Sequence, residues 1–236
     1  MTILSRNIVM ISAFAFVLVL GLLYSSSTPG FPVITGWPIA RLTIVEVYHK
    51  MCNISLNPGF NYFSAPCFGD EVAISTALEE FYQNLTNSSN MTVCSYKFRS
   101  IHAYDSTDSL DHWKSYNPCL PSYVVQDMAI LDDKKGYAIY MNLSARLEYG
   151  SDVSIPNYVP LFADWNFVGY PSNDTTGNRS VGVSIGSINQ SYLAIYSYSA
   201  GKWLFYNDSI HNFSFFEPFH PYWMRMLENA TWVIDW

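Results

Sequence analysis

Hydrophobic positions along the chain recur mainly at every second residue or in short β-branched and aromatic runs, which is typical of strands with one or two buried faces. Turn-forming residues separate these runs: 132–136 suits a hairpin loop and 199–202 suits a tight turn. The expected strands are 39–48, 92–104, 123–131, 137–147, 159–168, 181–188, 192–198 and 203–206. Strands this short and this regularly spaced predict a mainly β fold, an antiparallel sandwich or a barrel-like domain.

One segment departs from this alternation. Between Glu71 and Gln83 the apolar residues recur at helical spacing, with Asp70 placed to cap the first turn. We therefore expect one or two peripheral helices beside the strands. Within 192–198 the side chains of Tyr192, Ala194, Tyr196 and Tyr198 are expected to share one face.

The chain begins with an apolar run of 17 residues from Ile8 to Tyr24, preceded by Arg6. This length lies between a long signal peptide and a short membrane-spanning helix, and Ser25 and Ser27 offer a small-x-small cleavage site. The pattern predicts that 1–27 is a signal peptide or a signal-anchor transmembrane helix, with the N-terminus inside. A linker, 28–38, and an exterior domain, 39–236, follow; if the anchor is cleaved, the domain is secreted.

Sites for N-glycosylation are dense after the apolar run. Asn-x-Ser/Thr sequons occupy 11 of the 17 asparagines, far more than the Ser and Thr content would produce by chance. The sequons lie at Asn53, Asn84, Asn87, Asn90, Asn142, Asn173, Asn178, Asn189, Asn207, Asn212 and Asn229. They predict a glycoprotein of the cell surface, a virion envelope or the secretory lumen.

The four cysteines, Cys52, Cys67, Cys94 and Cys119, also lie after the apolar run and contain no Cys-x-x-Cys pair. In an oxidising exterior they are expected to form two disulfides, with three connectivities open. The exterior domain then divides into a disulfide-stabilised part, 39–120, and a cysteine-free β meander, 121–236.

Composition excludes several classes of protein. Half of the residues are apolar, 13% are charged and the net charge is −7, which disfavours both disorder and nucleic-acid binding. No phosphate-binding loop and no metal-ligand grouping of histidines is present, so no cofactor is expected.

Two local patterns suggest chemistry. Gly182 to Gly186 has the G-x-S-x-G form of a hydrolase nucleophile, with Ser184 followed by Asp208 and by His211 or His220, but the strand–helix alternation of that fold is missing. Asp105, Asp108 and Asp111 cluster without the alternate spacing of a calcium loop. We therefore expect no enzyme and no catalytic residues, with a loosely bound Ca²⁺ and a secreted hydrolase kept as alternatives.

The C-terminal third is rich in aromatic residues, which either fill a core or form a contact surface. These residues are Trp203, Phe205, Tyr206, Phe213, Phe215, Phe216, Phe219, Tyr222, Trp223, Trp232 and Trp236. The leading hypothesis is a single-pass, N-glycosylated surface protein that acts in structure, adhesion or recognition, through self-assembly or other protein partners. The alternative is an accessory exterior subunit of a larger membrane enzyme or transport complex.

Overall fold

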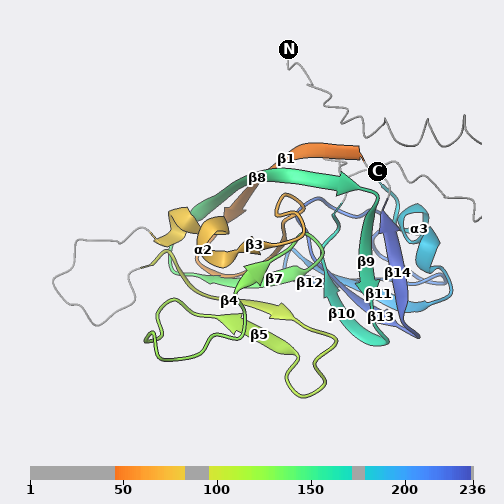
Figure 1. Ribbon diagram of the computed structural model, residues 1–236. Helices are drawn as coiled ribbons and strands as arrows, with labels where there is room; N and C mark the ends of the chain where they lie inside the picture. Colours follow the sequence, from red (N-terminus) through yellow and green to blue (C-terminus); the bar gives the residue numbers. More distant parts are fainter. Residues whose placement is uncertain (1–45, 83–95, 172–178, 235–236) are drawn as a thin grey trace, which may run out of the picture. The chain divides into compact units, whose positions relative to one another are not determined.

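A computed structural model describes residues 46–82, 96–171 and 179–234 (Figure 1). The fold is mainly β, with several antiparallel sheets and two short α-helices, so the predicted mainly β class with one or two helices is confirmed. The predicted N-terminal segment 1–27 and the linker 28–38 lie outside the described residues, as do Asn84, Asn87, Asn90, Asn173, Asn178, Cys94 and Trp236.

In the first half of the described chain, the first strand pairs with the last, and the strands of a four-stranded sheet lie between these two in the sequence. The outer pair is β1 (Glu46–Leu56) with β8 (Ala145–Ile155). The sheet has the order β2 (Gly59–Ser64), β7 (Gly136–Met141), β4 (Phe98–Tyr104), β5 (Trp113–Tyr116). Between β2 and β4 lie β3 (Val72–Ala73), α2 (Ile74–Ala77) and a 3-10 turn η1 (Glu79–Tyr82), and β3 pairs with β6 (Ile130–Leu131).

The second half is built in the same way. Its outer pair is β9 (Asn157–Leu161) with β14 (Ala230–Ile234). Its four-stranded sheet has the order β10 (Asp164–Val168), β13 (Tyr222–Met226), β11 (Tyr192–Ser199), β12 (Lys202–Tyr206). Between β10 and β11 lie α3 (Val181–Ser184) and the 3-10 turn η2 (Gly186–Ile188).

The two halves therefore share one topology, and we name them the first repeat (46–155) and the second repeat (157–234). In both four-stranded sheets, the strand that is first in the sequence pairs with the strand that is last. The last strand also pairs with the second, and the second pairs with the third. Both also place a short α-helix and a 3-10 turn between the first and second sheet strands, as Figure 1 shows.

Individual hydrogen bonds repeat as well. The Asn61 side chain accepts from the backbone N–H of Asn57 and donates to the carbonyls of Asn57 and Gly59. The Asn166 side chain makes the same three bonds: it accepts from the backbone N–H of Phe162 and donates to the carbonyls of Phe162 and Asp164. Gly59 and Asp164 both adopt positive φ, +95° and +74°, so the same tight turn opens β2 and β10.

Further equivalences extend through the repeats. The hydroxyls of Tyr137 and Tyr222 each accept the backbone N–H five residues earlier, at 2.7 and 2.6 Å. The β4–β7 pairing is irregular between Phe98 and Ser100, and the β11–β13 pairing between Tyr192 and Ala194, at the same place in each sheet. Equivalence at this level shows one structural unit built twice.

The repeats meet around an approximate two-fold axis. The backbone N–H of Ser64 donates to the carbonyl of Phe219, and that of Gly169 donates to the carbonyl of Lys134. Ser64 is equivalent to Gly169, and Phe219 to Lys134, so each bond is the counterpart of the other. A Cβ at Gly169 would lie 2.9 Å from the Cβ of Ser64 itself, which shows that equivalent residues touch at the axis.

Each repeat has its own hydrophobic core. The first contains Phe63, Ile101, Leu131, Tyr137 and Leu147 among others, all buried. The second contains Ile195, Phe216, Met224, Trp232 and Ile234 among others. Ile155–Pro156, a cis peptide bond, joins the repeats.

Several expected elements have different bounds. The predicted helix 71–83 is wrong in its length: only Ile74–Ala77 is α-helical, and Asp70 bonds to Lys134 Nζ at 2.5 Å instead of capping it. The backbone N–H of Ile74 donates to the carbonyl of Ala129, so the preceding residues pair as a strand. The predicted strand 181–188 is also wrong, because it forms α3 and η2 around buried Val181, Ile185 and Ile188.

The long predicted strands are divided. Runs 137–147 and 159–168 each contain a turn, at 142–144 and 162–163, and only 130–131 of the run 123–131 forms a strand. The register shift in β11 lies between Tyr192 and Ala194. Tyr192 therefore enters the second core with Ile195, whereas Ala194, Tyr196 and Tyr198 keep the predicted common face.

Candidate binding surface: an aromatic band between the repeats

Side chains on the two four-stranded sheets alternate between the repeat cores and an opposite face. In β13, for example, Tyr222, Met224 and Met226 enter the second core, while Trp223 points the other way. Aromatic rings dominate this opposite face and contact one another across the two repeats. We name the following rings the aromatic band: Tyr62, Tyr104, Trp113, Trp165, Phe167, Tyr196, Tyr198, Trp203 and Trp223.

One end of the aromatic band is a cluster of three rings. Tyr104 on β4 lies opposite Trp113 on β5, with ring centroids 5.6 Å apart and planes at 82°. Trp223 of the second repeat lies 5.0 Å from Tyr104 and 5.9 Å from Trp113. Because 44% of Trp113 remains exposed, this cluster is open to solvent.

The other end repeats that arrangement. Tyr198 on β11 lies opposite Trp203 on β12, with centroids 5.2 Å apart, and Tyr62 of the first repeat lies 5.9 Å from Tyr198. Trp203 is 59% exposed and Tyr62 is 45% exposed. Each end therefore combines a tyrosine–tryptophan pair from one repeat with a third ring from the other.

Polar groups flank both ends. Beside Tyr104 is an open pocket of about 140 Å³, whose charged lining consists of Asp105, Lys114, Asp127 and Lys135. Beside Tyr198 and Trp203 is a smaller hollow of about 20 Å³ that His220 also lines. Lys135 and His220 are equivalent residues in the two repeats, so the pockets occupy related positions.

His220 forms a part-buried pair with Ser197, whose Oγ lies 2.8 Å from Nε2. Burial lowers the pKa of His220, and the nearby Glu217 carboxylate opposes this effect. Ser197 is 4% exposed, so its hydroxyl positions the imidazole from within the fold and is not open to a substrate. Across the aromatic band, Arg225 lies 5.6 Å above the Trp165 ring, and its Nε donates to Asp164 at 3.3 Å.

The residues of the G-x-S-x-G pattern are not brought together with an acid and a base. Ser184 is buried, its Oγ donates to the Ser180 carbonyl, and its own carbonyl accepts from Trp232 Nε1 at 2.7 Å. Asp208 bonds to the Tyr192 hydroxyl and His220 bonds to Ser197, whereas the ring of His211 lies 5.2 Å from Tyr206.

In the aspartate cluster, local groups already occupy two of the carboxylates. Asp108 accepts from Lys114 Nζ at 2.6 Å and from two backbone N–H groups, and these bonds lower its pKa to about 2. Asp105 accepts from the hydroxyl and N–H of Thr107. Among the described residues no group of three or more metal-ligating side chains converges.

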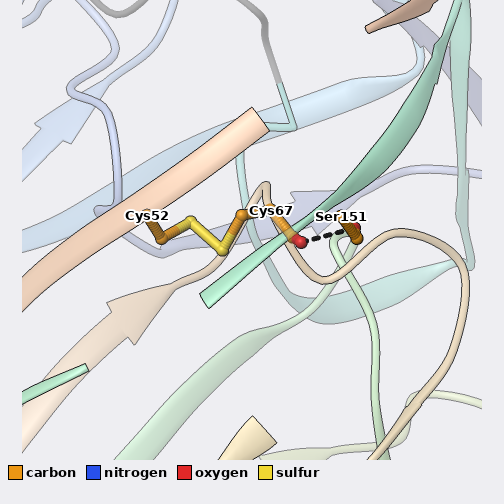
Figure 2. The surroundings of a disulfide bond; sticks show 3 residues. All are labelled: Cys52, Cys67 and Ser151. Atoms are coloured by element: carbon orange, nitrogen blue, oxygen red, sulfur yellow. Dashed lines mark hydrogen bonds between the residues drawn. A yellow bond between two sulfur atoms is a disulfide. The ribbon is translucent and has the colours of Figure 1, made fainter. Parts of the chain in front are cut away.

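One disulfide lies wholly within the described residues, in the first repeat. Cys52 on β1 is bonded to Cys67 in the loop after β2, and the Cys67 carbonyl accepts a 2.6 Å bond from Ser151 on β8 (Figure 2). Cys119 is also disulfide-bonded, and no described cysteine is free. Such bonds are consistent with an extracellular or lumenal location.

Six of the predicted sequons lie in the part of the chain that the structure describes. Asn53, Asn142, Asn189, Asn212 and Asn229 are exposed, and Asn207 is half-buried. Asn207, Asn212 and Asn229 each use Oδ1 to accept a backbone N–H. Their occupancy stays a prediction.

The predicted C-terminal aromatics divide between core and surface. Phe216, Tyr222 and Trp232 are buried in the second core, whereas Trp203 and Trp223 belong to the aromatic band. Sequence reasoning missed the contributions of Tyr62, Tyr104, Trp113 and Trp165. A tyrosine followed by a tryptophan across a turn, present in both repeats, was the available signal.

The part of the chain that the structure describes holds no helix long and apolar enough to cross a membrane. Comparisons with protein-family models, with curated proteins and with solved structures found no match.

Proposed function

We propose that this chain is a membrane-anchored, N-glycosylated exterior protein that acts by recognition, in adhesion or surface assembly, and that the aromatic band is its contact surface. The observation that carries the proposal is the exposure of Trp113, Trp203 and Tyr62 in two groups of contacting rings, which line the same small hollow. Tryptophan and tyrosine dominate the energetics of binding surfaces because they bury a large area at a low entropic cost.

Three features support an exterior location. The Cys52–Cys67 disulfide favours an oxidising compartment. All six described sequons have accessible or partly accessible asparagines, and the apolar run 8–24 precedes them in the order that an exported chain requires.

The location is tested on the full chain in its native membranes. Labelling with a membrane-impermeant reagent is expected to reach lysines after residue 28, and peptide mapping is expected to find glycosylated sequons. Native mass spectrometry in mild detergent should show a lone chain or a homo-oligomer. Unrelated membrane chains in fixed stoichiometry would overturn the proposal in favour of an accessory subunit.

The contact surface is tested with the full chain in lipid vesicles. Vesicles carrying the chain are expected to attach to the cells it comes from or to one another. A Trp113→Ala, Trp203→Ala double variant should reduce this attachment at least tenfold, while Tyr158→Ala, an exposed aromatic on β9, should leave it unchanged. Equal attachment by all three proteins would remove the aromatic band from the function.

A further inference from the structure

The geometry points to two quasi-equivalent carbohydrate-binding platforms at the ends of the aromatic band. The first platform is Tyr104 with Trp113, and the second is Tyr198 with Trp203. This inference rests on the proposed recognition function and names its ligand class: a neutral glycan whose sugar rings stack on the exposed indoles.

The same exposed tyrosine–tryptophan pair occurs at equivalent positions in both repeats. Tyr104 pairs with Trp113 in the register of β4 and β5, and Tyr198 pairs with Trp203 at the same position of β11 and β12. The neighbouring pairs on this face have diverged: His102 with Ser115 in one repeat, Tyr196 with Phe205 in the other.

Neither Trp113 nor Trp203 belongs to a repeat core. They lie opposite the repeat cores, and 44% of Trp113 and 59% of Trp203 remain in solvent. Most other shared residues, such as Tyr137 and Tyr222, are buried in the cores and have a structural reason to be the same. A large exposed ring kept at both positions therefore indicates a ligand.

At both platforms the flat aromatic rings lie beside groups that can form hydrogen bonds. A sugar presents an apolar C–H face and a rim of hydroxyls, so it needs an aromatic plane beside donors and acceptors. The pocket beside Tyr104 is lined by the carboxylates of Asp105 and Asp127 and by the ammonium groups of Lys114 and Lys135. Each of these groups already has a protein partner, but a carboxylate accepts and an ammonium donates more than one bond, so acceptors and donors remain for a sugar. At the second platform the indole lies beside the hollow that His220 lines.

The charged groups around the aromatic band also restrict the class of ligand. Two carboxylates and two ammonium groups line the first pocket, and within the aromatic band Arg225 is matched by Asp164. Both ammonium groups are already paired with aspartates outside the pocket, so the surface has no excess of positive charge that would attract an anionic partner. A neutral polyhydroxyl ligand fits this surface, whereas a phosphate or a sulfated glycan would require an excess of positive charge.

The test is calorimetric titration of the full chain, purified in detergent and treated to remove its own N-glycans, with defined oligosaccharides. The neutral probes are linear α-1,4-glucan, β-1,4-glucan and α-mannan hexasaccharides, and the anionic probe is a heparin hexasaccharide. At least one neutral probe is expected to bind at two sites per chain and to alter tryptophan fluorescence. The anionic probe is expected to bind at least tenfold more weakly.

Matched variants assign the sites. Trp113→Ala and Trp203→Ala are each expected to reduce the stoichiometry from two to one, and the double variant should abolish binding. Tyr158→Ala should retain both sites. Circular dichroism and the melting temperature verify that each variant is folded.

Two outcomes overturn the inference. One is no binding of any neutral probe at millimolar concentration, and the other is binding that the double variant retains. If vesicle attachment still depends on Trp113 and Trp203, the recognition function survives and its partner is a protein. If attachment is also independent of them, the proposed function fails together with the inference.

Discussion

Asp133 is a buried carboxylate at the junction of the repeats. Its Oδ2 accepts from Asn157 Nδ2 at 2.7 Å, its Oδ1 lies 3.5 Å from Lys134 Nζ, and its backbone N–H donates to the Gly69 carbonyl. Burial raises the pKa of Asp133 from 3.8 to about 6, although Lys134 and Asn157 both oppose the shift. The folded protein therefore holds a proton here that the unfolded chain releases at lower pH.

This shift has a defined sign. A carboxyl whose pKa is raised on folding contributes stability that is fully present below about pH 4 and is lost as the pH rises through about 6. Asp133→Asn removes the ionisation. The stability of the variant relative to the parent should therefore be greater at pH 7.5 than at pH 4.5, by about 2 kcal/mol. Urea unfolding at both pH values measures the difference.

An exposed carboxylate provides the control for this comparison. Asp111→Asn removes an exposed carboxylate 3.8 Å from Lys114, and as a surface substitution it is expected to change the free energy of unfolding by no more than about 0.5 kcal/mol. An Asp133→Asn variant whose stability relative to the parent is the same at pH 4.5 and 7.5 would contradict the raised pKa.

The Cys52–Cys67 bond ties β1 to the loop after β2, and Ser151 ties that loop to β8. The bond closes a loop of 15 residues in sequence separation, a length for which chain entropy predicts about 3 kcal/mol of stabilisation. A Cys52→Ala, Cys67→Ala double variant is expected to lose roughly that free energy of unfolding in guanidinium titrations.

Ser151→Ala separates the two contributions. It removes one side-chain bond and should cost only about 1 kcal/mol, because the Cys67 carbonyl loses a single donor. A double cysteine variant no less stable than Ser151→Ala would show that the disulfide does not stabilise this part of the fold.

At the scale of elements, alternation in the sequence predicted the mainly β class and the location of many strands. It did not predict where strands break, because turns such as the one before Asp164 depend on a side-chain bond from Asn166 that leaves no periodic signal. The region 71–83 has helical spacing, but Val72 and Ala73 pair with β6 from 57 residues later, so a tertiary contact overrides the local preference.

The candidate surface was predictable only in part. The aromatic content of the C-terminal third indicated a contact surface or a core, and this third holds both buried and exposed aromatic residues. The rings of the first repeat were not found, because their approach to Trp223 depends on the two-fold packing of the repeats. The repeats themselves have loops of different length and share few residues, so no fixed period appears in the sequence.

At the scale of the whole described chain, the repeats depend on close contact at their axis. A Cβ at Gly169 would lie 2.9 Å from Ser64 Cβ and 3.0 Å from the Asp133 carbonyl, and both partners are held by the fold. Gly169→Ala is therefore expected to reduce the free energy of unfolding by roughly 1–3 kcal/mol in urea titrations.

Gly186→Ala is the matched variant, since an added Cβ there meets nothing within 4 Å. It should leave stability unchanged or raise it slightly, because alanine lowers the entropy of the unfolded chain. If both glycine variants had the same stability, the tight contact at the axis would not limit the packing of the repeats.

The two-fold axis also decides how freely the two sides of the chain can differ. If two identical chains paired in this way, any substitution near the axis would occur twice, and each residue would have to tolerate itself as a neighbour. Within a single chain that constraint disappears, because equivalent residues can differ. A Cβ at Gly136 would lie 2.8 Å from the Cβ of Pro221, its equivalent in the second repeat. Likewise, Lys135 lines one pocket and its equivalent, His220, lines the other. One covalent chain can therefore display two related but non-identical surfaces, each open to its own selection.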